Sequence, residues 1–128
     1  MTHEDEYFDN MVTMLELIWG EGYMAPGGPG NVAKMLLGIE TQERQVLDIG
    51  CGIGGPAFEM ATTHGAMVTG IDLEGPLIER AARSAAERGI EDRCRFQQVT
   101  AGRLPFDDQT FDIVVSACLL YTSDAADD

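Results

Sequence analysis

The chain has 128 residues, which is enough for one small domain with a hydrophobic core. Its 22 acidic and 8 basic residues give a net charge of -14, which argues against a nucleic-acid partner because phosphate binding needs clustered basic side chains. No apolar run is long enough to cross a membrane and no signal peptide is recognisable, so we expect a cytoplasmic protein without a membrane partner. The 3 cysteines lack metal-ligand spacing, and no metal site is expected.

The first forty residues predict two helices joined by a loop. Apolar residues at helical spacing predict a helix over residues 6–19, and Gly20 is the residue that ends it. Residues 22–30 are rich in glycine and proline and predict a loop without regular structure. Asn31 is the predicted N-cap of a second helix that runs to about Ile39.

Beyond residue 45 the apolar pattern changes to alternating strands and helices. Short apolar runs predict strands at residues 46–49, 67–71, 94–99 and 111–116. Two helices are predicted between them, opening near Pro56 and Pro76, and Gly89 ends the second. This alternation predicts a parallel sheet with helices on both faces, which is a doubly wound, Rossmann-like α/β fold.

A glycine-rich turn follows the first predicted strand. Gly50, Gly52, Gly54 and Gly55 let the backbone approach a ligand closely, at the N-terminus of a helix. The same glycines fit the Gly-x-Gly-x-x-Gly pattern of dinucleotide-binding proteins. Asp72, near the end of the second predicted strand, is placed to accept ribose hydroxyls from either kind of nucleotide ligand. These features alone leave the ligand open.

Two further features separate the alternatives. Asp48 precedes the glycines and gives the pattern Asp-x-Gly-x-Gly-x-Gly, where a carboxylate suits a cationic ligand and would repel a pyrophosphate. Residues 103–116, Arg-Leu-Pro-Phe-Asp-Asp-Gln-Thr-Phe-Asp-Ile-Val-Val-Ser, look like the approach to the fourth strand in methyltransferases. Together these blocks resemble class I S-adenosylmethionine-dependent methyltransferases over residues 46–117. An NAD(P)-dependent oxidoreductase is the alternative.

The resemblance implies S-adenosylmethionine as cofactor and assigns roles to single residues. Gly50 and Gly52 would contact its methionine part, and Asp48 would orient the amino group. Asp72 would bind the ribose and Leu73 would pack on the adenine. Thr100 stands where the family often has an acidic residue, so we expect backbone groups to carry more of the adenine recognition. The predicted cofactor-binding residues are Asp48, Gly50, Cys51, Gly52, Gly54, Asp72, Leu73, Thr100, Ala101, Tyr23 and Met24.

The N-terminal segment resembles phosphoethanolamine N-methyltransferases and their bacterial relatives at residues 7–9 and 19–28. By that resemblance residues 1–40 form a lid, Tyr7 belongs to the active site, and Tyr23 and Met24 line the cofactor entrance. The alternative is that Tyr7 and Tyr23 are ordinary packing aromatics. The implied partner is a small-molecule methyl acceptor, such as the amine phosphoethanolamine, and no metal is required.

The last eleven residues, 118–128, resemble the translation of a sequencing adapter and are expected to be a non-native tail. Residues 41–117 would then form part of a cofactor-binding domain, with about four strands of the N-terminal half of the fold. We therefore expect a fragment that keeps the nucleotide site and is inactive by itself. A catalytically incompetent nucleotide-binding fragment is thus a further interpretation of the chain.

Overall fold

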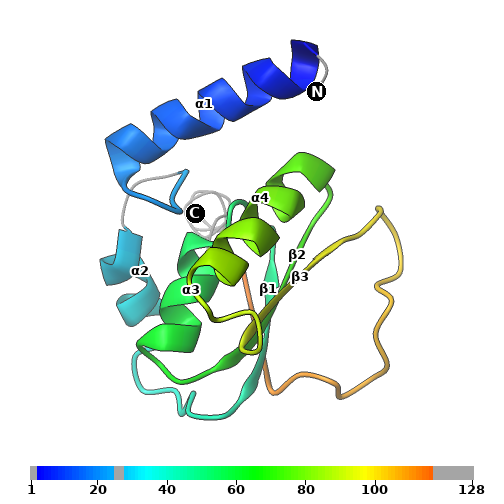
Figure 1. The fold of residues 1–128 in the computed structure, drawn as a ribbon. Helices are drawn as coiled ribbons and strands as arrows, with labels where there is room; N and C mark the ends of the chain where they lie inside the picture. The colour runs from blue at the N-terminus through cyan, green and yellow to red at the C-terminus, as the bar shows by residue number, and fades with distance from the viewer. Residues whose placement is uncertain (1–2, 25–27, 117–128) are drawn as a thin grey trace, which may run out of the picture.

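The computed structural model describes residues 3–24 and 28–116, and for residues 3–9 and Trp19 it describes the backbone alone. The predicted tail at 118–128 lies outside the described residues. Four parallel strands form one sheet in the order β3-β2-β1-β4 (Figure 1). They are β1 (Gln45–Ile49), β2 (Met67–Asp72), β3 (Cys94–Gln98) and β4 (Ile113–Val115). The predicted Rossmann-like α/β fold is confirmed.

The core lies between the sheet and the helices that connect its strands. Val46, in the central strand β1, is 0% exposed and pairs with Val68 of β2 and Ile113 of β4. The helices α3 (Gly55–Thr62) and α4 (Gly75–Glu87) follow β1 and β2, and each carries proline in its first turn as predicted. Burial of their apolar faces against the strands fixes the sheet and therefore the loops at its edge.

The two connecting helices lie on the same face of the sheet (Figure 1). From β1 to β2 to β3 the chain moves in one direction across the sheet, so two right-handed crossovers place α3 and α4 on one side. On the other side, Leu47 and Val114 line a shallow groove together with the loop at residues 103–111. Helices on that second face, as in the complete doubly wound arrangement, are not found among residues 3–24 and 28–116.

The N-terminal region differs from the prediction in its second helix. α1 (His3–Trp19) ends as predicted, with the Gly20 amide donating to the carbonyl of Glu16 at 2.8 Å. α2 spans Gly28–Met35, so the predicted loop at 28–30 is helical and Asn31 lies inside the helix rather than at its N-cap. Proline is compatible with the first turn of a helix, and the cluster around Pro29 therefore starts α2 instead of preventing it.

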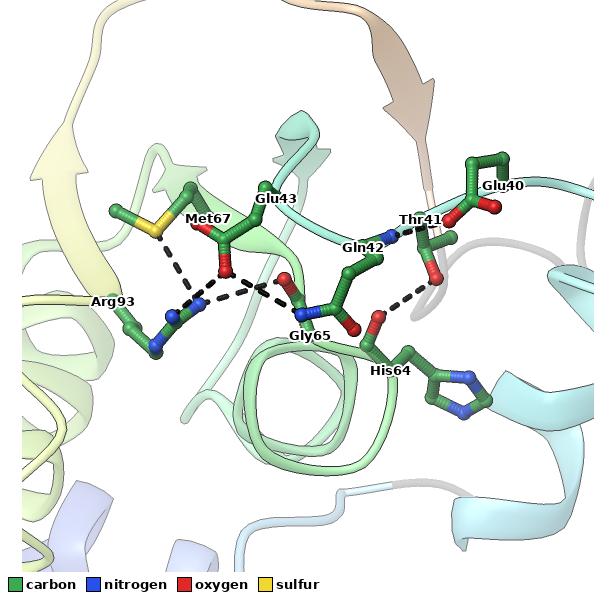
Figure 2. A network of polar contacts seen from close by, with 8 residues as sticks. All are labelled: Glu40, Thr41, Gln42, Glu43, His64, Gly65, Met67 and Arg93. Carbon is green, nitrogen blue, oxygen red and sulfur yellow. Dashed lines mark hydrogen bonds and ion pairs between the residues drawn. The ribbon is translucent and has the colours of Figure 1, made fainter.

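Polar contacts brace the sheet at the amino ends of its strands (Figure 2). Arg93 donates to the Glu43 carboxylate at 2.9 Å and to the carbonyl of Gly65 at 3.4 Å, which connects the residues preceding β1, β2 and β3. The hydrogen bond and charge of Glu43 raise the pKa of Arg93. Thr41 donates to the carbonyl of His64 at 2.8 Å. These contacts occupy one end of the sheet and leave the carboxyl ends of the strands for the pocket described below.

Cys94 is expected to resist alkylation in the folded protein. Its side chain is 2% exposed, its Sγ lies 3.5 Å from the carbonyl of Ala57, and burial raises the pKa of its thiol to about 12. Only the thiolate is nucleophilic, so at pH 8 the reactive form is about one part in ten thousand. Iodoacetamide followed by peptide mass spectrometry should show no modification of Cys94 in buffer and full modification in urea. Equal labelling under both conditions would contradict the buried position.

Candidate functional site

A cleft of about 560 Å³ opens at the carboxyl ends of β1 and β2, a size typical of small-ligand sites. This is the edge at which open parallel sheets bind their ligands. The cleft is walled mainly by apolar side chains, and its lining residues are Met24, Ile49, Gly50, Gly52, Ile71, Asp72, Leu73, Leu77, Val99, Thr100, Ala101, Gly102 and Leu104. Among the residues that the structure describes, the lining includes one carboxylate, from Asp72, and no lysine, arginine or histidine.

The glycine turn, residues 50–55, follows β1 and is held against the end of β2 by hydrogen bonds of its own backbone. The amides of Gly50 and Cys51 both donate to the carbonyl of Ile71, at 2.8 and 3.0 Å. Gly50 and Gly52 adopt φ values of 70° and 59°, which disfavour any side chain and allow the chain to reverse sharply. The turn is therefore fixed by the same strand whose end forms the neighbouring wall of the cleft.

Asp72 connects the two walls through its carboxylate. One oxygen accepts the amide of Gly52 at 3.0 Å, and the other accepts the amide of Glu74 at 3.1 Å. The side chain is half-buried and faces the cleft, where its remaining acceptor capacity is available to hydroxyl groups of a ligand. Asp72 thus holds the glycine turn in place and presents negative charge to the cleft.

Comparison with known proteins identifies this arrangement. Residues 46–127, which include the glycine turn and Asp72, match the methyltransferase domain family. The chain belongs to that family. It is 44% identical over 120 residues to 27-O-demethylrifamycin SV methyltransferase of Amycolatopsis mediterranei, covering 84% of this chain and 44% of that protein. It is 31% identical over 112 residues to phosphoethanolamine N-methyltransferase 3 of Arabidopsis thaliana, covering 87% of this chain and 22% of the relative.

Among solved structures, phosphoethanolamine N-methyltransferase 2 of Haemonchus contortus in complex with S-adenosyl-L-methionine superimposes with a TM-score of 0.78 at 30% identity. The match covers 87% of this chain and 26% of that one. The chain therefore spans less than half the length of each of these methyltransferases.

Seven of the residues that the methyltransferase resemblance selects lie on the cleft surface. They come from the N-terminal segment, the glycine turn, the end of β2 and the segment after β3, which shows that the fold brings distant parts of the sequence to one place. Leu73 is 57% exposed and so has apolar surface available to a ligand. The seven residues are Met24, Gly50, Gly52, Asp72, Leu73, Thr100 and Ala101.

The other predicted residues lie behind the lining or outside the described part of the chain. Asp48 and Cys51 are each 0% exposed, which places them beneath the surface of the glycine turn. Gly54 is the N-cap of α3, with φ 97°, and Tyr23 lies close to the first residue of that helix. These four residues do not line the cleft directly. The side chain of Tyr7 lies outside the described residues.

The lining also contains apolar residues that were not predicted. Ile49, Ile71 and Val99 stand at or just after the carboxyl ends of strands, a position that could have been recognised once the strands were assigned. Leu77, on the first turn of α4, and Leu104, in the loop beyond β3, carry no comparable signal because their places depend on tertiary packing.

No cluster of histidine, cysteine or carboxylate side chains suited to a metal is found in the described part of the chain. None of the described helices is long and apolar enough to cross a membrane.

Proposed function

We propose that this chain is the cofactor-binding part of a methyltransferase that uses S-adenosylmethionine to methylate a small molecule. The observation that carries the proposal is the charge of the cleft, whose described lining residues include the Asp72 carboxylate and no basic side chain. S-adenosylmethionine combines a nucleoside with a sulfonium and an ammonium group, and a cleft wall with a carboxylate and no basic side chain in its described part suits these two cations. Family membership and the cofactor named for the Haemonchus contortus relative give independent support.

The contacts of the glycine turn argue against a nicotinamide dinucleotide. A pyrophosphate is held by backbone amides at the start of a helix or by basic side chains. Gly52 already donates its amide to Asp72, and Gly55 donates its amide to the carbonyl of Gly22 at 2.8 Å. The Asp72 carboxylate suits the ribose of either ligand and does not separate the two. Two of the amides that a pyrophosphate would use are therefore already bonded within the chain.

The residues present fit the nucleoside part of the proposed cofactor. We assign the ribose hydroxyls to Asp72, the adenine to Leu73 and the backbone near Thr100, and the methionine part to Gly50 and Gly52. For Asp48, which is 0% exposed beneath the turn, a role towards the amino group stays a prediction from the resemblance. When bound, S-adenosylmethionine supplies an electrophilic methyl group on a positively charged sulfur. The apolar walls of the cleft orient the ligand and exclude water.

The methyl acceptor is proposed to be a small molecule with an amine or a hydroxyl group. The likeness to phosphoethanolamine N-methyltransferases, which covers 87% of this chain, favours an amine and a role for Tyr7 in the active site. The 44% identity to 27-O-demethylrifamycin SV methyltransferase favours a hydroxyl. The chain spans 44% of that relative, and we propose that it binds the cofactor without completing methyl transfer by itself.

Isothermal titration calorimetry on the 128-residue chain tests the cofactor. S-adenosylhomocysteine is expected to bind with a dissociation constant of about 10 µM or tighter, and NAD⁺ about 100-fold more weakly. A thermal unfolding scan of the same sample verifies that the chain is folded. Tighter binding of NAD⁺, or failure of a cooperatively unfolding chain to bind S-adenosylhomocysteine, would reject the proposed function.

A further inference from the structure

The carboxylate of Glu16 joins three segments of the chain. One of its oxygens accepts the Arg80 guanidinium of α4 at 2.6 Å, and the other accepts the backbone amide of Gly22 at 2.6 Å. The side chains of Arg80 and Glu16 are 21% and 17% exposed, so this ion pair is more sheltered from water than an ordinary surface pair. Glu16 therefore holds α1, α4 and the turn after α1 together.

Gly22 is also hydrogen-bonded to the glycine turn. Its carbonyl accepts the amide of Gly55, the first residue of α3, at 2.8 Å. A Cβ atom on Gly55 would overlap that carbonyl, and Gly22 itself has a φ of 86°, so the approach requires glycine at both positions. A continuous series of hydrogen bonds thus runs from Arg80 through Glu16 and Gly22 to Gly55, at the edge of the cofactor cleft.

Apolar packing supports only part of this interface. Val12 of α1 is 0% exposed and forms a small cluster with Ile53 of the glycine turn, Leu77 of α4 and the partly buried Met24. Beyond Val12, α1 and α4 border a groove of about 500 Å³ that is lined mostly by polar residues, and Figure 1 shows α1 running alongside α4. The second half of α1 is therefore held by directed polar contacts more than by a close-packed core.

We propose that the Glu16–Arg80 pair is a positioning device that holds residues 20–24, the entrance turn, against the glycine turn and so completes the cleft wall at Met24. Glu16 and Arg80 do not line the cleft and would act on a ligand only through the entrance turn. Weakening the pair lets the entrance turn open, which speeds ligand release. The effect on ligand release rests on the proposed function, whereas the position of the entrance turn is a property of the chain without ligand.

Hydrogen–deuterium exchange of the ligand-free chain tests the position of the entrance turn. In Glu16→Ala, amides of residues 20–24 are expected to exchange about tenfold faster, because a charged hydrogen-bond partner is lost. Glu16→Gln, which keeps an acceptor for Gly22 and loses the charge, should give a smaller increase. Amides of β1 should be unchanged in both variants. Unchanged exchange at 20–24, or an equal increase in β1, would overturn the proposal.

Glu21→Gln is the matched control. Glu21 also pairs with an arginine of the α4 region, Arg88, but at 3.6 Å and with its side chain 84% exposed, so its loss should leave exchange at residues 20–24 unchanged. If Glu16→Ala fails to fold, Glu16→Gln still decides the question. An increase in Glu21→Gln as large as in Glu16→Gln would show that general charge, rather than this pair, holds the turn.

Stopped-flow binding of S-adenosylhomocysteine provides the second readout. Glu16→Ala and Arg80→Ala should each raise the dissociation rate about tenfold, with the association rate within about twofold. The double variant should dissociate little faster than Glu16→Ala alone, because both changes remove the same pair. Fully additive effects would overturn the proposal. If the wild-type chain does not bind S-adenosylhomocysteine, the proposed function fails while the exchange pattern still decides the role of Glu16.

Discussion

Asp72→Ala is expected to weaken binding of S-adenosylhomocysteine by about two orders of magnitude. The substitution removes the one carboxylate among the described residues that line the cleft, and with it the acceptors proposed for two ribose hydroxyls. Hydrogen bonds to a charged group contribute about 1.5–3 kcal/mol each, and the loss of two at the lower end of this range, about 3 kcal/mol, corresponds to two orders of magnitude. The Gly52 amide also loses its acceptor, which loosens the glycine turn and adds to the effect.

Calorimetry on purified variants measures this loss, and two substitutions separate its causes. Asp72→Asn keeps one oxygen that can accept the Gly52 amide and loses the acceptor of the Glu74 amide, so it should retain more thermal stability than Asp72→Ala while still losing most affinity. Leu73→Ala, beside Asp72 on the cleft surface, should cost less than tenfold because its side chain is already 57% exposed. Wild-type affinity in Asp72→Ala would show that Asp72 does not take part in binding the ligand.

The parts of the site that the sequence predicts are those fixed by local patterns. Strand, glycines and helix follow one another within about a dozen residues, so the glycine turn can be placed without any knowledge of tertiary structure. Asp72 is predictable because the end of the next parallel strand must lie at the same edge of the sheet. The element bounds differ from the prediction by a few residues, most clearly at α2, where Pro29 begins a helix in a segment that its glycines mark as a loop.

The contacts that depend on tertiary packing could not be predicted in this way. Gly22 and Gly55 are far apart in the sequence, and no pattern indicates that the carbonyl of one accepts the amide of the other. Leu77 and Leu104 are ordinary apolar residues until the fold places them on the cleft. Asp48 illustrates the reverse case, since its motif predicts a ligand contact and the structure places it, fully buried, beneath the turn. A motif therefore identifies which residues belong to a site. It does not tell whether each of them lines the cleft or lies buried behind the lining.

Packing beneath the glycine turn leaves no room for a side chain at Gly70. Gly70→Ala is therefore expected to lower the free energy of unfolding by about 2–3 kcal/mol. Gly70 lies within β2, and a Cβ atom there would come within 2.8 Å of Cδ1 of Phe96 and 2.9 Å of Sγ of Cys51. Neither neighbour can retreat easily, because Cys51 is 0% exposed and Phe96 packs edge-on against Phe58 at 5.7 Å between ring centroids. The strain should also reach the cleft, since Cys51 belongs to the glycine turn.

Urea unfolding of Gly70→Ala beside Gly30→Ala measures this effect with a matched control. Gly30 lies in α2 with nothing within 4 Å of the position that a Cβ atom would take, so alanine there should be neutral or stabilise the chain by about 0.5–1 kcal/mol. The same chemical change therefore has opposite expected signs at the two positions. S-adenosylhomocysteine affinity should fall in Gly70→Ala alone, because the residue after it, Ile71, accepts the amide of Gly50 that holds the turn. Equal stability of the two variants would show that the space beside Gly70 is less closely filled than its neighbours indicate.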